Sequence, residues 1–192
     1  MSDKQVAEQA FDRVEQNLRD LSRWMYENPE LGCEEFEASA RISTFFGDNG
    51  FDLTYPSHGL DTAFEATVGT TGPRVVICCE DDALPEVGHP CGRNVIATSA
   101  VGAGVALAPL AEELGIRVTV LGTPAEATGR AYERIVSGAG HDACYLASRG
   151  PAAIVSVPCR DGLSHNEAES IEPGQAEVGA EVLLHAALSL AS

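Results

Sequence analysis

Residues 74–94 read RVVICCEDDALPEVGHPCGRN, and this stretch decides the fold expected for the chain. Its first six residues, 74–79, contain a continuous apolar run of the kind found in strands that are covered on both faces. A polar segment follows at once, with consecutive carboxylates at 80–82, an imidazole at His89 and a thiol at Cys91. Open α/β sheets collect functional groups at the carboxyl ends of their strands. We therefore expect a functional site directly after this strand.

The segments around this strand alternate between helical and strand patterns. Apolar residues recur at spacings of three and four up to about residue 26, and Pro29 follows, which predicts an amphipathic helix. Further helices are expected at 35–46, 95–114 and 173–190, and strands at 51–55, 62–68, 74–79, 116–121 and 152–157. The helix at 95–114 joins two strands in a β-loop-α-β unit, which gives parallel pairing. Its Gly102 and Gly104 suggest close packing on the sheet. The predicted fold is an α/β fold, a three-layer α/β/α sandwich with a largely parallel central sheet.

The charge of the chain restricts its partners. Twenty-nine acidic residues against twelve basic ones give a formal net charge of −17. Such a surface repels phosphate backbones and anionic lipids, so we expect neither nucleic acid nor a membrane as a partner. The longest uncharged stretch, 94–111, is interrupted by Pro109 and is shorter than the roughly 20 apolar residues of a membrane span. It is interpreted as a buried core helix.

Length and cysteine usage indicate one domain in a reducing compartment. The 192 residues suffice for a single domain with a full core, and they contain no internal repeat or low-complexity linker. None of the six cysteines forms a C-x-x-C pair. The polar N-terminus lacks the basic and apolar regions of a secretory signal. We expect one domain over residues 1–192, mostly reduced cysteines and a cytoplasmic location.

Three loops that leave strand ends carry ionisable groups, at 80–94, 123–128 and 160–169. A site assembled from such loops, with one cysteine, a few histidines and several carboxylates, has the ligand chemistry of zinc or manganese. His89, which precedes a proline, and His58, which lies in a loop, are expected to be solvated instead.

Six short motifs then occur in the order in which a known family carries them. They are NPELG at 28–32, DALP at 82–85, GHPCGRN at 88–94, GTPAE at 122–126, SGAGHDA at 137–143 and GLSHNEAE at 162–169. In these motifs the chain resembles the M20 family of metal-dependent amidohydrolases and peptidases. Any single motif would be weak, whereas six in order are specific. The resemblance covers most of the chain and implies the catalytic domain of such a hydrolase.

The resemblance also implies residue roles. Cys91 resembles a metal-bridging thiolate and His165 a ligand of the second metal. Asp82 resembles the carboxylate that orients a ligand, Glu126 the general base, and His141 a histidine that polarises the scissile carbonyl. The implied chemistry is hydrolysis of an amide or N-acyl bond by a zinc- or manganese-activated hydroxide. The implied substrates are N-acyl or N-carbamoyl amino acids or small peptides.

The chain departs from the family pattern at three places. The pattern would place a histidine where Arg93 stands and a metal-binding glutamate where Ala127 stands. A guanidinium cannot coordinate a metal. The lid and dimerisation domain of the family would lie between Glu126 and Ser137, where only about ten residues connect. We therefore expect a lid domain excised between 127 and 137, and a monomer.

These departures leave alternative interpretations open. Cys91 could be a packed thiol, Glu126 a carboxylate bonded to backbone amides, and His165 the hydrogen-bonded neighbour of Glu169. A cation amid carboxylates can replace the charge of a metal. The candidate partners of Arg93 are Glu80, Asp82, Glu126 and Glu169. For the whole chain, the alternative to an impaired metallohydrolase is a natural or engineered inactive scaffold with at most weak metal or ligand binding.

Overall fold

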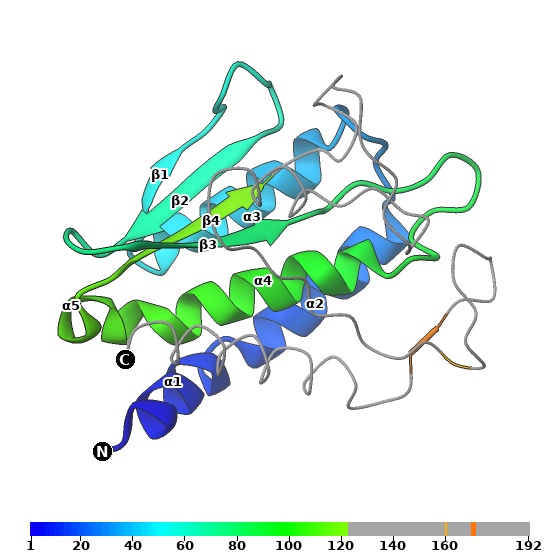
Figure 1. Ribbon diagram of the computed structural model, residues 1–192. Helices are drawn as coiled ribbons and strands as arrows, with labels where there is room; N and C mark the ends of the chain where they lie inside the picture. The colour runs from blue at the N-terminus through cyan, green and yellow to red at the C-terminus, as the bar shows by residue number, and fades with distance from the viewer. Residues whose placement is uncertain (123–159, 161–169, 172–192) are drawn as a thin grey trace.

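The fold is seen in a computed structural model that describes residues 1–122, 160 and 170–171 (Figure 1). Its elements are α1 (Asp3–Asp12), α2 (Glu15–Glu27), α3 (Phe36–Asp48), β1 (Asp52–Thr54), β2 (Phe64–Val68), β3 (Arg74–Cys79), α4 (Arg93–Leu107), the 3-10 turn η1 (Ala108–Leu110), α5 (Ala111–Leu114) and β4 (Arg117–Gly122). The elements predicted at 152–157 and 173–190 lie outside the described residues.

The four described strands form one mixed sheet in the order β1-β2-β4-β3. β3 and β4 are parallel, with Val75 opposite Val118, so the predicted β-loop-α-β unit around α4 is confirmed. β2 runs antiparallel to both β1 and β4. The prediction of a largely parallel sheet is therefore wrong for the described strands. Residues 69–73 between β2 and β3 are too few for the crossover that parallel strands require, so β2 must run the opposite way to β3.

Helices α3 and α4 cover the same face of this sheet. Phe64, Ala66 and Val120 are fully buried on that face. The ring of Phe46 in α3 lies 5.9 Å from that of Phe64, centroid to centroid. A Cβ atom at Gly104 of α4 would meet both Val120 and Phe46. The described residues thus build two layers, and the third layer of the predicted sandwich is not seen among them.

α4 is the central helix of the core. The stretch 93–114 is long and apolar enough to cross a membrane by length and composition, but 72% of its most apolar part is buried inside the molecule. Gly104 packs closely on β4, as predicted. Gly102 instead faces the N-terminal helices, because a Cβ there would lie 2.8 Å from the ring of Phe11 and 3.1 Å from Leu18. The core-helix interpretation is confirmed.

The N-terminal apolar face is divided between two helices. Val14, Leu18 and Met25, which belong to the apolar pattern that ends at about residue 26, are buried. The chain nevertheless breaks between α1 and α2, where the Val14 N–H donates to the carbonyl of Phe11 at 2.9 Å. The break lets both helices contact α4 along different parts of its length, as Figure 1 shows.

Candidate functional site

The loop after β3 lies where the sequence predicts a site, between the carboxyl end of β3 and the start of α4 (Figure 1). Leu84 and Gly88 exchange two backbone hydrogen bonds of 2.8 and 3.0 Å, which close the loop into a turn. Gly92 then adopts a left-handed conformation with φ of 69° and starts α4 at Arg93. A strand end and a helix start therefore meet at this point.

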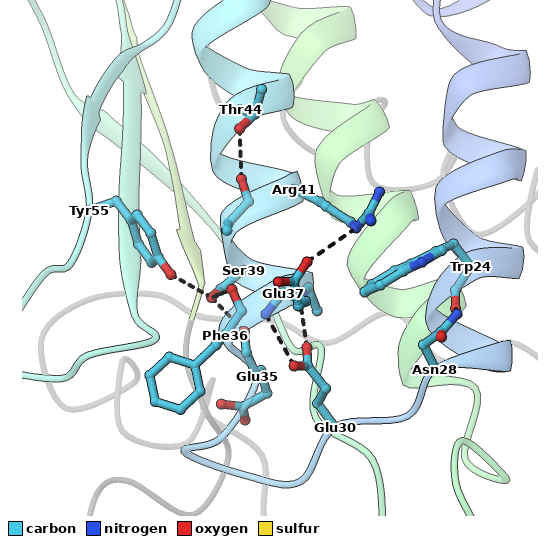
Figure 2. Close-up of polar contacts among 12 residues, drawn as sticks. Trp24, Asn28, Glu30, Glu35, Phe36, Glu37, Ser39, Arg41, Thr44 and Tyr55 are labelled. Atoms are coloured by element: carbon cyan, nitrogen blue, oxygen red, sulfur yellow. Dashed lines mark hydrogen bonds and ion pairs between the residues drawn. The ribbon is translucent and has the colours of Figure 1, made fainter.

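Residues 28–32 hold this loop against α3. The Ala83 N–H donates to the carbonyl of Glu30 at 2.6 Å, and Leu31 forms a parallel bridge with Ala83. The Glu30 carboxylate accepts hydrogen bonds from the amides of Glu37 at 3.1 Å and Ala38 at 2.7 Å (Figure 2). These amides belong to the first turn of α3, where backbone donors lack helical partners. Glu30 thus joins the DALP loop to α3, a role that the sequence analysis did not assign.

Arg93 forms ion pairs with two of its four predicted partners. Its Nη1 donates to Oδ2 of Asp82, and its Nε lies 3.9 Å from Oε2 of Glu80. The exposed fractions are 17% for the Arg93 side chain, 13% for Glu80 and 3% for Asp82. The prediction that Arg93 pairs with these two carboxylates is confirmed. The other candidates, Glu126 and Glu169, lie outside the described residues.

Two further carboxylic acids are buried near these ion pairs. Glu35 is fully buried and accepts a hydrogen bond from Thr62 Oγ1 at 2.9 Å, and Asp81 is 3% exposed. Burial raises the pKa of Glu35, against the opposing effect of its hydrogen bonds. Burial also raises the pKa of Asp81 well above its usual value; the charge of Glu35 adds to this, while Arg93 opposes it. Within the described part of the chain, no donor reaches Oε1 of Glu35 or Oδ2 of Asp81.

Of the two histidines that were expected to be exposed to solvent, one is buried. His89 is 6% exposed, so the expectation that it is solvated is wrong. Burial lowers its pKa, and a hydrogen bond with the Met25 backbone opposes the shift. The hydrogen bond to Met25 places His89 against α2. His58 is exposed, as predicted, and lies 3.1 Å from a Glu65 oxygen.

The chain shows similarity to proteins of one family. A family model described as "Peptidase family M20/M25/M40" matches residues 118–189. The chain is 38% identical over 140 residues to the Xaa-Arg dipeptidase of Mus musculus, which covers 66% of this chain and 32% of that protein. It is 51% identical over 67 residues to the N-carbamoyl-L-amino-acid amidohydrolase of Rhizobium meliloti, covering 35% and 16%. Over these stretches the chain is similar to members of the M20 family.

A solved structure supports the same fold. A Bacillus subtilis protein, described as a dinuclear metal-binding peptidase of the M20 family, superposes with a TM-score of 0.54. The two chains share 24% identity over 60% of this chain and 36% of the other. The chain spans about a third of the length of the mouse relative.

The described part of the candidate site does not fit a divalent cation. Asp82, the residue with an implied orienting role, gives one carboxylate oxygen to Arg93, whose positive charge would repel a metal ion. Cys91 lies half-buried two residues before Arg93. In residues 1–122, 160 and 170–171, no three His, Cys, Asp or Glu side chains converge as metal ligands. Three predicted site residues, Glu126, His141 and His165, lie outside the described residues, so their roles stay predictions.

Proposed function

We propose that this chain is an M20 amidohydrolase domain for N-acyl or N-carbamoyl amino acids or small peptides, and that its hydrolytic activity is impaired. The substrate class is supported by two relatives, one a dipeptidase and the other an N-carbamoyl-amino-acid amidohydrolase. The matched region covers 32% and 16% of those proteins. The substrate class is therefore a proposal for this chain.

The contact between Arg93 and Asp82 is the observation that carries the impairment. An ionised carboxylate only accepts hydrogen bonds, and Asp82 accepts one from the guanidinium. A guanidinium keeps its charge across the working pH range. One of the two carboxylate oxygens of Asp82 is therefore held by a permanent cation, while no described donor reaches its Oδ1.

Several features of the proposal go beyond the described residues. In this proposal Glu126 is the base, His141 contacts the substrate, and Cys91 and His165 are what remains of a zinc or manganese site. A three-layer arrangement, one domain over residues 1–192, a monomeric state and a cytoplasmic location belong to the same proposal.

Hydrolysis assays on the purified chain test this function. An N-acetyl amino acid, an N-carbamoyl amino acid and a dipeptide are each incubated with added zinc or manganese and, separately, with a chelator. We expect turnover close to the uncatalysed rate in every case, and higher metal uptake by Arg93→His. Arg74→His is the matched control, because Arg74 is exposed and pairs with Glu65 on β2. Two metal ions per wild-type chain together with chelator-sensitive turnover would refute the impairment.

The second candidate function is a non-catalytic scaffold, which the ion pairs of Arg93 also favour. The double variant Arg93→His with Ala127→Glu distinguishes the two, because it restores the residue types of the family pattern. Chelator-sensitive hydrolysis by this variant indicates an impaired enzyme. Metal uptake without hydrolysis indicates that the substrate machinery is gone as well, which supports the scaffold.

A further inference from the structure

Several carboxylic acids are buried or largely buried directly after the end of β3. Glu80, Asp81 and Asp82 are consecutive, and two of them, Asp81 and Asp82, are at least 97% buried. Asp81 also feels the charge of Glu35, which is fully buried. Several buried carboxylates without compensating positive charge would strongly disfavour folding. A cation beside the carboxylates that stay ionised therefore stabilises this part of the fold.

Arg93 lies at the amino end of a helix, where the helix dipole is unfavourable for a cation. It is the first residue of α4, a helix of fifteen residues whose amino end carries partial positive charge. Its guanidinium is largely buried, so water cannot offset this repulsion fully. The ion pairs with Glu80 and Asp82 must outweigh both effects, which indicates that the carboxylates hold the guanidinium there.

The guanidinium also links two separate elements. Glu80 and Asp82 follow β3, whereas Arg93 opens α4, and the loop between them runs into the GHPCGRN motif, of which Arg93 is part. A planar guanidinium offers several donors in a fixed arrangement, so one side chain can contact two carboxylates at once. A divalent metal held by side chains from both elements would link them in the same way.

We propose that Arg93 is a built-in cation that joins the end of β3 to the start of α4, so that this part of the fold forms without a divalent metal. The proposal goes beyond the proposed function, because it concerns folding and would hold whether or not the chain hydrolyses amides. Its consequence is that chelators and added metals leave the stability of the wild-type chain unchanged.

Thermal unfolding of single variants tests the built-in cation. Wild-type protein is expected to show the same Tm with EDTA, with zinc and with manganese. Arg93→Ala should lower the Tm by about 10 °C, because it removes the ion pair of the buried Asp82 carboxylate. Millimolar methylguanidinium should restore part of this loss. Arg74→Ala, which removes a half-exposed ion pair to Glu65, is the control and should change the Tm little.

A double variant keeps the test decisive if Arg93→Ala does not fold. Asp82→Asn removes the charge that Arg93 neutralises, so Arg93→Ala with Asp82→Asn should be more stable than Arg93→Ala alone. Arg93→Lys keeps the charge without the planar geometry and should have an intermediate Tm without response to methylguanidinium. The proposal is wrong if Arg93→Ala unfolds at the wild-type Tm, if the two substitutions destabilise additively, or if EDTA lowers the wild-type Tm. Amide hydrolysis is not measured in this experiment, so the two proposals can fail separately.

Discussion

At the scale of single residues, Asp81 is a buried acid whose charged form the folded state disfavours. It is 3% exposed, its Oδ2 has no donor among the described residues, and it lies near the buried Glu35. Burial raises its pKa, so the folded state binds a proton more tightly than the unfolded chain does. Asp81 therefore favours folding at low pH, and this contribution is lost as the pH rises from about 4 through the folded pKa.

We predict that Asp81→Asn raises the free energy of unfolding at pH 7 by about 1–2 kcal/mol, because an amide is buried at lower cost than a carboxylate. The gain should shrink as the pH falls, and it should level off below pH 4, where Asp81 becomes protonated in the unfolded chain as well. Urea unfolding at a series of pH values measures both effects. Asp52→Asn on β1 is the control, because Asp52 is exposed. A variant that is less stable than wild type at pH 7 would contradict the assignment.

Charged contacts close in sequence could be predicted, and distant ones could not. Arg93 follows Asp82 by eleven residues within one loop, so a pairing between them can be inferred from charge and loop length. Thr62 and Glu35 are 27 residues apart, and nothing local indicates that they meet. The same holds for Glu30 and Ala83, whose contact depends on how α3 packs.

At the scale of elements, Gly122 at the end of β4 belongs to a sequence motif and is also needed for packing of the core. Gly122 opens the GTPAE motif, which the family resemblance connects with catalysis. It pairs directly with Phe64 across β2 and β4, and a Cβ at this position would overlap the Phe64 ring. Phe64 is fully buried and contacts Phe46, so the ring has little room to move. The glycine is required by the core as well as by the loop that follows.

We predict that Gly122→Ala destabilises the chain by about 1–3 kcal/mol, the usual cost of an overpacked core. Phe64→Leu in the same chain should recover part of the loss by removing the overlapping atoms. Gly47→Ala is the matched control, since a Cβ at Gly47 meets nothing within 4 Å. Chemical denaturation of the four proteins measures the differences. Equal effects of Gly122→Ala and Gly47→Ala would show that Phe64 relaxes freely.

Helices and strands could be predicted from the sequence where the pattern of apolar residues within the element itself determines its structure. β3, α4 and β4 follow from an apolar run, a long uncharged stretch and a second apolar run. The break before α2 has no glycine or proline to signal it, because it arises from the way two helices share α4. The short connection at 69–73 sets the direction of β2 relative to β3, but nothing local indicates that β2 pairs with β4, which lies about 50 residues later in the chain. Pairing over that distance is decided by packing.

At the scale of the whole molecule, the net charge of −17 opposes close association of copies. We predict a monomer, because the chain also lacks room between residues 126 and 137 for a dimerisation domain. Light scattering at physiological salt is expected to give a mass of about one chain, 20.1 kDa. Raising the ionic strength screens the repulsion and provides the control. A stable dimer at low salt would contradict the prediction.

The hydrogen bonds of Glu30 couple the position of α3 to the position of the loop after β3. One residue holds the loop through its carbonyl and α3 through its carboxylate, while the α3 residue Arg41 stacks 4.0 Å from the ring centroid of Trp24 on α2 (Figure 2). A tilt of α3 would therefore pull on residue 83 and shift Asp82 relative to Arg93. Because Glu30 connects α3 to the loop, the two should move together. We therefore expect that a substitution on the outer side of α3 can change the distance between Asp82 and Arg93 without contacting either residue.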